Sequence, residues 1–229
     1  MEPKAEFDRY AKNYDELLRD PIRDTFAPTT DFFHWRKWIL IENFIRRHGL
    51  SPDKMAWLDV GCGKGELLML GRSRFGRVAG CDPSAEMIRD AGAIEIHEQK
   101  LPDSLPFADE SFDFATAVCV YHHVNESSRG SLTSEIRRIL RPHGIFCMIE
   151  HNPLNPITRL IVRRSPVDVE ARLLSMQLAK SYTHQAALRF LESEYFLCLP
   201  ERFYHRFGNL ESRVKALPLG GQYAIFVQR

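Results

Sequence analysis

The sequence predicts an α/β fold with a doubly wound, mostly parallel sheet, and three observations lead to this expectation. Between residues 55 and 150, short apolar runs typical of buried strands alternate with amphipathic segments typical of helices. Three glycines at alternate positions follow the first apolar run, so the backbone there can approach a ligand closely. An acid, Asp82, ends the second apolar run, where such folds place the residue that binds ribose hydroxyls.

The composition is that of one ordinary globular domain. The chain has 229 residues, of which 44% are hydrophobic and 27% are charged, and its net charge is +1. A chain of this length can bury a sizeable core. A net charge this small gives no electrostatic reason to expect a nucleic-acid partner, which usually requires a basic face. The oligomeric state is left open.

The cysteines and the N-terminus favour a cytoplasmic location. The five cysteines are odd in number and contain no C-x-x-C pair, so we expect buried free thiols in a reducing compartment. Three of the first six residues are charged and no apolar segment follows them, which argues against a signal peptide. No apolar run approaches the ~18 to 20 residues that a membrane span needs.

Two helices are expected before the core, within residues 1–50. In the first, apolar side chains fall on one helical face. These are Phe7, Tyr10, Tyr14, Leu17 and Leu18. The second begins near Thr30 and ends at His48, because Gly49 suits the left-handed position after a helix.

The core at 55–150 is expected to contain five parallel strands with helices between them. The predicted strands are 55–60, 77–81, 94–97, 113–119 and 145–150. Residues 151–194 are mostly helical by pattern and longer than a simple crossover needs, so we interpret them as a cap over a substrate pocket. Residues 195–229 are expected to form C-terminal strands, 195–204 and 222–228, arranged as an antiparallel hairpin.

The glycine-rich turn resembles a known motif. Asp59-Val-Gly-Cys-Gly-Lys-Gly65 is similar to the D-x-G-x-G-x-G motif of class I S-adenosylmethionine-dependent methyltransferases. Three further segments, 78–87, 105–113 and 139–146, resemble later motifs of that family in the same order. Within the family, the chain most resembles the small-molecule branch that includes the ubiquinone and menaquinone biosynthesis methyltransferases.

The resemblance implies a Rossmann-like fold, S-adenosylmethionine as cofactor and S-adenosylhomocysteine as product. It also implies that the N-terminal helices form a lid over the cofactor. A nicotinamide dinucleotide fits the turn less well. Its fingerprint is G-x-G-x-x-G, whereas here the third glycine, Gly65, lies four residues after Gly61 and an acid precedes the set. A glycine turn without any ligand remains the simplest alternative.

The candidate cofactor-binding residues lie where the strands end, with two more on the lid. They are Asp59, Gly61, Cys62, Gly63, Asp82, Pro83, Met87, Cys119, Tyr14 and Arg36. Ordinary structural roles compete with several of these assignments: Asp82 could cap the next helix, and Met87 and Tyr14 could be core residues. The family often has an acid that bonds the adenine amine at position 101, which is leucine here. Gln99, Asp103 or a backbone carbonyl would have to replace it.

Two histidines are candidates for a catalytic base, His123 after the fourth strand and His151 after the fifth. A structural role beside the cofactor is the alternative for each. No metal is expected, because Cys119, His122 and His123 lack a second pair of ligands at suitable spacing.

The sequence therefore predicts methyl transfer to an oxygen, nitrogen or carbon atom of a small acceptor. Aromatic residues in the lid and cap suggest that the acceptor is apolar or aromatic. They are Phe32, Phe33, Trp35, Trp38 and Tyr182. The alternative is a module that binds S-adenosylmethionine without transferring its methyl group.

Overall fold

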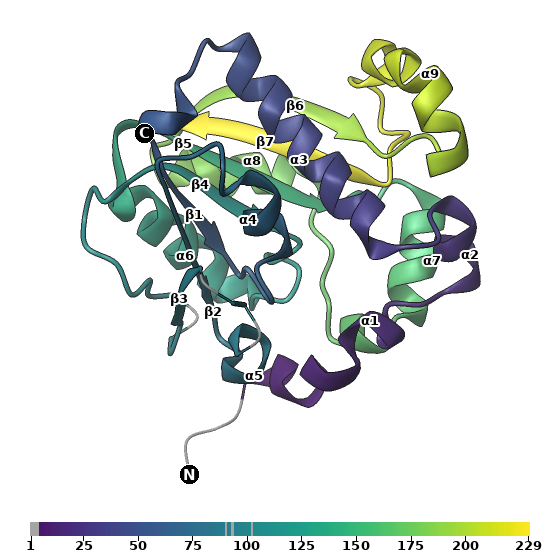
Figure 1. Cartoon of the computed structure of the whole chain (residues 1–229), viewed down its shortest axis with the longest axis horizontal. Helices are drawn as coiled ribbons and strands as arrows, with labels where there is room; N and C mark the ends of the chain where they lie inside the picture. Colours follow the sequence, from purple (N-terminus) through teal and green to yellow (C-terminus); the bar gives the residue numbers. More distant parts are fainter. Residues whose placement is uncertain (1–4, 90, 93, 102) are drawn as a thin grey trace.

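A single seven-stranded sheet organises the computed structural model, which describes residues 5–89, 91–92, 94–101 and 103–229 (Figure 1). The first four residues of the expected lid and Pro102 of the 98–103 loop lie outside the described residues. The strands are β1 (Ala56–Val60), β2 (Arg77–Asp82), β3 (Glu95–Glu98), β4 (Phe112–Val118), β5 (Leu140–His151), β6 (Arg189–Phe196) and β7 (Gln222–Gln228).

The strand order is β3-β2-β1-β4-β5-β7-β6. β1 pairs in parallel with both β2 and β4, so the chain reverses its direction of winding between β1 and β4. Only β7 runs against its neighbours, β5 and β6. The predicted doubly wound, mostly parallel sheet with an antiparallel C-terminal pair is confirmed. In such sheets ligands bind outside the carboxyl ends of the strands at the reversal.

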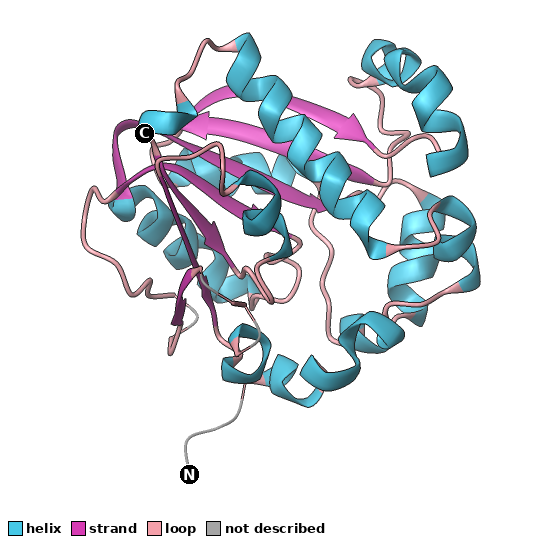
Figure 2. Ribbon diagram, viewed as in Figure 1, coloured by secondary structure: helices cyan, strands magenta, loops and turns pink. Residues whose placement is uncertain are grey.

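Helices cover both faces of the sheet (Figure 2). α3 (Thr30–Arg47) and α4 (Glu66–Gly71) lie on one face, where Phe44 stacks on Phe226 with ring centroids 3.9 Å apart. α6 (Glu126–Ile139) and α8 (Met176–Gln185) pack on the other face, with Leu132 and Ile136 fully buried. Burial of such side chains contributes roughly 1.5 to 3 kcal/mol each. α5 (Ala85–Ile88) follows β2 and is capped by Ser84, as predicted.

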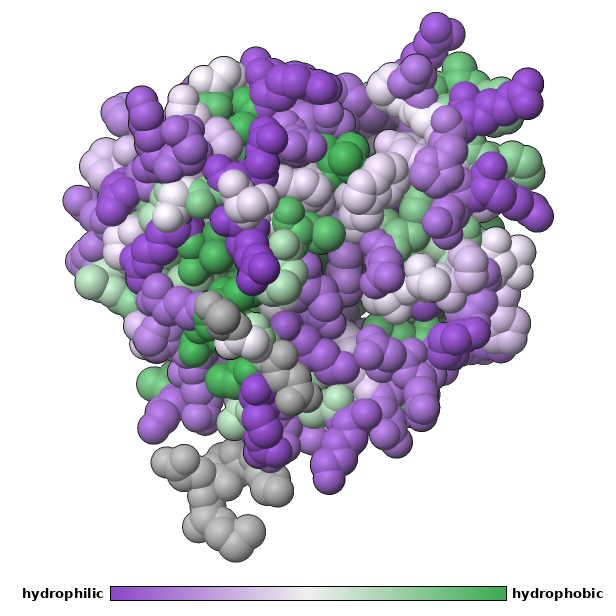
Figure 3. All heavy atoms as spheres, viewed as in Figure 1, coloured by the Kyte–Doolittle hydropathy of each residue, from purple (hydrophilic) through white to green (hydrophobic). Residues whose placement is uncertain are grey.

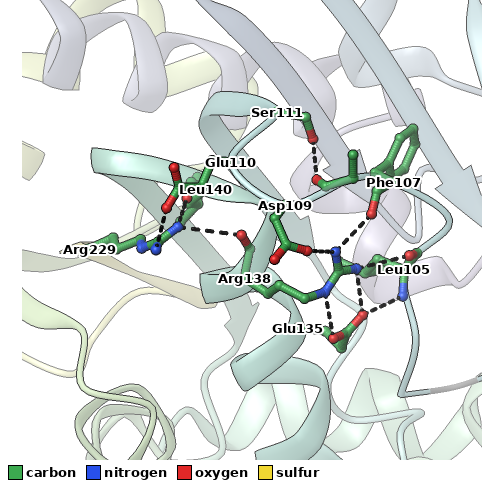
Figure 4. A network of polar contacts seen from close by, with 10 residues as sticks. Leu105, Phe107, Asp109, Glu110, Ser111, Glu135, Arg138, Leu140 and Arg229 are labelled. Atoms are coloured by element: carbon green, nitrogen blue, oxygen red, sulfur yellow. Dashed lines mark hydrogen bonds and ion pairs between the residues drawn. The ribbon is translucent and has the colours of Figure 1, made fainter.

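The segment between β3 and β4 is tied down by one arginine of α6 (Figure 4). Arg138 donates hydrogen bonds to the carbonyls of Leu105 and Phe107 and pairs with the carboxylates of Asp109 and Glu135. Glu135 in turn accepts from the backbone N–H of Leu105 at 3.0 Å. The motif at 105–113 therefore fixes the end of the loop to α6.

The N-terminal segment differs from the single helix expected over residues 7–18. It consists of η1 (Glu6–Arg9), η2 (Ala11–Asn13) and α1 (Tyr14–Leu17), and α2 (Pro21–Phe26) follows. The segment stretches from α5 to α7 (Pro156–Arg164), as Figure 1 shows. Contacts along it override the weak helix preference of its aromatic residues. Asp8 accepts from the Ser84 hydroxyl at 2.6 Å, and the Tyr10 hydroxyl donates to the carbonyl of Pro166 at 3.1 Å.

The C-terminal third also needs correction. Of the expected cap, α7 and η4 (Pro166–Asp168) lie beside the N-terminal segment, whereas α8 packs on the sheet with α6. β6 begins at Arg189 and stops at Phe196, because Leu197 adopts a left-handed backbone (φ 61°). α9 (Glu201–Val214) replaces the end of the expected strand. Its apolar side chains recur at helical spacing, a pattern that the prediction overlooked.

The surface seen in Figure 3 and the helices bear on contact with other molecules. The face in Figure 3 is mostly hydrophilic, with hydrophobic residues in scattered groups. Within the described residues, no helix combines the length and the apolar character needed to cross a bilayer.

Candidate active site

The glycine turn after β1 adopts a conformation that only glycine takes easily. Gly61, Gly63 and Gly65 have φ angles of 69°, 54° and 79°. The N–H groups of Gly61 and Cys62 donate to the carbonyl of Cys81 at 2.7 and 3.0 Å. The turn is thereby held against the end of β2, with Asp82 beside it.

Asp82 joins the turn to α5. One carboxylate oxygen accepts from the Gly63 N–H and the other from the Ser84 N–H, both at 2.8 Å. Burial raises the pKa of Asp82, and these two hydrogen bonds act against the rise. Each oxygen keeps a second lone pair for another donor. The capping role that competes with ligand binding is therefore present, and it does not use all the acceptor capacity of the carboxylate.

Asp59 lies at the end of β1 and is 3% exposed. Its Oδ1 accepts from the Thr116 hydroxyl at 2.5 Å. Burial raises the pKa of Asp59 to about 7, while the Thr116 hydrogen bond and the Lys37 charge lower it. A cationic ligand group placed here would favour the ionised carboxylate.

A cavity of about 1010 Å³ lies over the carboxyl ends of β1, β2 and β4. Its walls contain nine of the ten predicted cofactor residues: Tyr14, Asp59, Gly61, Cys62, Gly63, Asp82, Pro83, Met87 and Cys119. Residues 98–101, which belong to the loop expected beside the adenine, form another part of the cavity wall. Gln99 lines the cavity and Asp103 does not, and the Gln99 amide donates to the carbonyl of Leu101 at 3.0 Å.

A second cavity, of about 740 Å³, lies between the N-terminal segment and α7. Its apolar lining includes Leu18, Ile22, Phe26, Phe33, Ile157 and Ile161. Five residues line both cavities: Tyr14, His34, Lys37, Cys119 and His123. Two ligands bound in these cavities would therefore meet at this shared wall. Of the five aromatic residues expected around an acceptor, only Phe33 lines this space, because Phe32 and Trp38 belong to the core beneath α3.

Four titratable groups surround His122 beside this wall. The His122 Nδ1 lies 2.5 Å from Glu150 Oε2. Asp168 Oδ1 lies 3.5 Å from His122 Nε2 and 3.3 Å from His123 Nε2. The ring of His151 is centred 5.0 Å from that of His122. His123 and His151, the two predicted catalytic residues, both line the second cavity.

The protonation of these histidines differs. Burial opposes charge on His122, but Glu150 and Asp168 outweigh it and raise its pKa to about 10. Burial and the His122 charge lower the pKa of His151 to about 4, and burial also lowers the pKa of His123. At neutral pH, His123 and His151 are therefore neutral imidazoles that can accept a proton.

Arg36 is not part of either cavity, which corrects its assignment as a cofactor residue. Its guanidinium is 4% exposed, pairs with Glu211 of α9 and lies 3.6 Å from the centre of the Tyr204 ring. The next residue, Lys37, faces the shared wall instead. Successive residues of a helix point about 100° apart, so neighbouring side chains such as Arg36 and Lys37 lie in different environments. Arg36 anchors α9 to α3.

We expect the Arg36→Ala variant to lose about 3 to 5 kcal/mol of unfolding free energy, because Glu211 would remain buried without its partner. Its affinity for S-adenosylhomocysteine should stay within two-fold of wild type. Urea unfolding and calorimetry measure the two quantities, and Arg46→Ala, on the exposed side of α3, is the matched control. A stability loss below about 1 kcal/mol would show that the pair does not anchor α9.

The sequence-based prediction missed several residues around the cavities. Phe7, Asp8, His34 and Lys37 come from the N-terminal segment and α3, far from the strand ends that guided the prediction. Only Lys37 had a usable signal, as a cation within an apolar helical pattern. Asp168 had none, since it lies in an irregular stretch 45 residues after His123.

The chain is similar to known methyltransferases. Residues 58–148 match the family model described as a methyltransferase domain. A tRNA (carboxymethyluridine(34)-5-O)-methyltransferase from Arabidopsis thaliana is 28% identical over 153 residues, which cover 65% of this chain and 36% of that protein. A ubiquinone/menaquinone biosynthesis C-methyltransferase from Geotalea daltonii is 30% identical over 143 residues, or 56% of this chain and 60% of the relative.

The chain thus spans roughly one third to three fifths of the length of these two relatives. A solved structure from Thermotoga maritima, described as a S-adenosylmethionine-dependent methyltransferase and possible histamine N-methyltransferase, matches with a TM-score of 0.66 at 18% identity. The match covers 97% of each chain. Residues 58–148 thus match a methyltransferase domain, and the whole chain has the fold of class I methyltransferases.

Proposed function

We propose that the protein transfers the methyl group of S-adenosylmethionine to a small, apolar or aromatic acceptor. The observation that carries this proposal is the pair of cavities with one shared wall. The larger contains the glycine turn and Asp82, and the smaller is mainly apolar. Transfer requires the methyl carbon and the acceptor atom to be aligned at close range, and well-oriented groups reach effective molarities of ~10⁵ M or more.

The cofactor would use the polar groups of the larger cavity. Asp82 accepts hydrogen bonds from the two ribose hydroxyls, through the lone pairs that Gly63 and Ser84 leave free. The ammonium group lies near Asp59, and the carboxylate has a counter-charge in Lys37. Met87 and Pro83 contact the adenine, with Gln99 or a carbonyl of the 98–101 loop at its amine. Cys62, Cys119 and Tyr14 complete the walls.

In the reaction, the bond between sulfur and the methyl carbon breaks and its electron pair stays on sulfur. A lone pair or carbanion of the acceptor forms the new bond. An acceptor hydroxyl must also lose its proton, whereas a neutral amine loses one only after transfer. His151 and His123 are neutral at the acceptor cavity and can take that proton.

The N-terminal segment acts as a lid in this proposal, and α7 with η4 forms the cap. The Tyr10–Pro166 hydrogen bond joins lid to cap, and the Asp8–Ser84 bond joins the lid to the cofactor side. An ion pair between Lys64 and Asp15, at 3.1 Å, adds a third link near the glycine turn. Residues 1–229 then act as one domain, with the lid within 1–50 and the cofactor core at 55–150.

The affinity for S-adenosylhomocysteine should rise about ten-fold between pH 6 and pH 8. The pKa of buried Asp59 lies at about 7, so its carboxyl is mostly neutral at the lower pH and ionised at the higher. Only the ionised form attracts the ligand ammonium. The stability of the protein without ligand should change in the opposite direction. Because the pKa of Asp59 is raised in the folded state, the unfolding free energy falls as the pH rises from about 4 to about 7.

Calorimetric titrations across this pH range test the prediction, with Asp59→Asn as the comparison. The variant should bind more weakly at pH 8 and lose the pH dependence. An affinity that stays constant in the wild-type protein would contradict the assignment of Asp59 to the ammonium group.

A small acceptor is favoured over a nucleic acid by the net charge of +1, although three relatives have names that include tRNA. The five free cysteines favour a cytoplasmic location. The alternative function is a module that binds the cofactor without transferring methyl.

An acceptor screen tests the proposal. Purified protein is incubated with S-adenosylmethionine and sets of phenols, quinols, amines and bulk tRNA, and S-adenosylhomocysteine is measured. The expected result is turnover with an apolar or aromatic acceptor that falls about ten-fold or more in the Asp82→Ala variant when S-adenosylmethionine is below saturation. Turnover with tRNA alone would overturn the small-acceptor assignment, and tight cofactor binding without any turnover would favour the binding module.

A further inference from the structure

Three side chains next to the shared wall bring their donor atoms together. His122 and His123 follow β4, and Asp168 ends η4 of the cap. One ligand atom from each residue lies within 4.8 Å of those of the other two. His122 is buried, and the other two are largely covered, so the group is not a chance assembly of surface residues.

The separations between Asp168 and the two histidines fit ligands of a common ion as well as the ion pairs that these residues form without one. Asp168 Oδ1 is 3.3 Å from His123 Nε2 and 3.5 Å from His122 Nε2. Strong N–H···O bonds are about 2.7 to 3.2 Å long. Two ligands at about 2.0 to 2.1 Å from a tetrahedral zinc ion lie about 3.3 to 3.4 Å apart. The carboxylate oxygen therefore already lies near the required spacing from both histidines.

His122 has the outer support that metal-binding histidines usually have. Its other ring nitrogen, Nδ1, lies 2.5 Å from Glu150, which is fully buried. The Tyr121 N–H donates to the second Glu150 oxygen at 2.7 Å, so this carboxylate is itself fixed. A carboxylate bonded to Nδ1 orients the ring so that Nε2 points toward a metal. The second ring proton, which Glu150 and Asp168 stabilise on His122 without a metal, would be released when the ion binds.

The open side of the group faces the proposed acceptor space. All three residues line the second cavity, and His123 also lines the cofactor cavity. Three protein ligands leave at least one position free, as in catalytic rather than structural metal sites. A 2-His-1-carboxylate set suits divalent transition metals, and not the all-oxygen shells that Mg²⁺ and Ca²⁺ prefer.

We propose that His122 Nε2, His123 Nε2 and Asp168 Oδ1 bind a divalent transition-metal ion whose open position faces the second cavity. The binding site stands on this geometry alone. Its use rests on the proposed function: the ion would hold an acceptor through an oxygen atom, such as a phenol or hydroxyl, next to the methyl group. His123 is then a ligand, which leaves His151 as the neutral imidazole that can accept a proton.

Metal binding is measured on protein treated with EDTA and then freed of the chelator. Zn²⁺ is titrated by calorimetry, Co²⁺ by its visible absorption, and bound metal is counted by elemental analysis. We expect one ion per chain, with Co²⁺ bands of nitrogen and oxygen coordination. Asp168→Asn and His123→Gln should each weaken Zn²⁺ binding at least ten-fold.

Two controls separate this site from other histidines and from misfolding. His97→Gln changes an exposed histidine beside Glu95 on β3 and should bind Zn²⁺ as wild type does. Binding of S-adenosylhomocysteine by Asp168→Asn reports on its folding, independently of the metal. The proposal is overturned if the wild-type protein binds no stoichiometric ion, or if folded Asp168→Asn and His123→Gln both retain wild-type affinity. Failure of cofactor binding with intact metal binding would instead count against the proposed function.

Discussion

The Asp82→Ala variant should bind S-adenosylhomocysteine 10- to 100-fold more weakly than the wild-type protein. This corresponds to about 1.4 to 2.8 kcal/mol. A carboxylate that accepts from ribose hydroxyls makes charge-assisted hydrogen bonds, which are roughly twice as strong as neutral ones. The substitution also removes the acceptors of Gly63 and Ser84, so the glycine turn loses its link to α5. Calorimetric titration of both proteins measures the difference.

Two further variants separate these contributions. Asp82→Asn keeps one acceptor oxygen and should fall between the wild type and Asp82→Ala. Asp53→Ala, an exposed aspartate outside both cavities, should bind as the wild type does. If Asp82→Ala folds normally and binds the ligand with wild-type affinity, Asp82 does not contact the cofactor, and only its role at the start of α5 remains.

The Gly61→Ala variant should lose both stability and cofactor affinity. Gly61 has a φ of 69°, and a left-handed backbone costs other residues about 1 to 2 kcal/mol. A methyl group here would also come within 2.5 Å of Val120 Cγ2, so Val120 would have to move. Val120 lines the cofactor cavity, and its movement would change the space for the ligand. We expect a stability loss of about 2 to 3 kcal/mol and at least ten-fold weaker binding.

Gly130→Ala is the matched control for Gly61→Ala. Gly130 lies inside α6, and no atom would meet an added Cβ within 4 Å. This substitution should stabilise the protein by about 0.5 to 1 kcal/mol. The double variant Gly61→Ala/Val120→Ala removes the clash and keeps the backbone strain, so it should recover part of the affinity. Unchanged stability and binding in Gly61→Ala alone would contradict the described geometry of the turn.

The parts of the fold predicted well are those where local pattern and burial agree. β1, β2 and β4 are apolar runs, of which the first ends before a glycine and the second ends in an acid, and each was placed to within one residue. α3 ends at Arg47 before Gly49, which has the left-handed φ expected there. The N-terminal segment was not predicted, because its conformation depends on contacts with distant residues, and α9 was missed although its apolar side chains recur at helical spacing. Tyr10 bonds Pro166, and α9 is held by the Arg36–Glu211 pair.

The site residues, like the elements of the fold, were predicted where the local sequence places them and missed where distant parts of the chain do. Asp59, the glycines and Asp82 are fixed by the ends of neighbouring strands, so their spacing in the sequence located them. To identify Lys37 as a cavity residue, the rotation of α3 about its axis must be known to within one residue. The prediction named the neighbouring Arg36 instead. Asp168 comes from the cap and reaches His122 and His123 only through the path of the folded chain. No local pattern around Asp168 indicates this contact.

The central claim is that the larger cavity binds S-adenosylmethionine, and calorimetric titration of the wild-type protein with S-adenosylhomocysteine and with NAD tests it most directly. We predict micromolar or tighter binding of S-adenosylhomocysteine at pH 8, one molecule per chain, and no binding of NAD. Folded protein that binds NAD, or that fails to bind S-adenosylhomocysteine, would contradict the claim, and the glycine turn beside Asp82 would then need a different ligand.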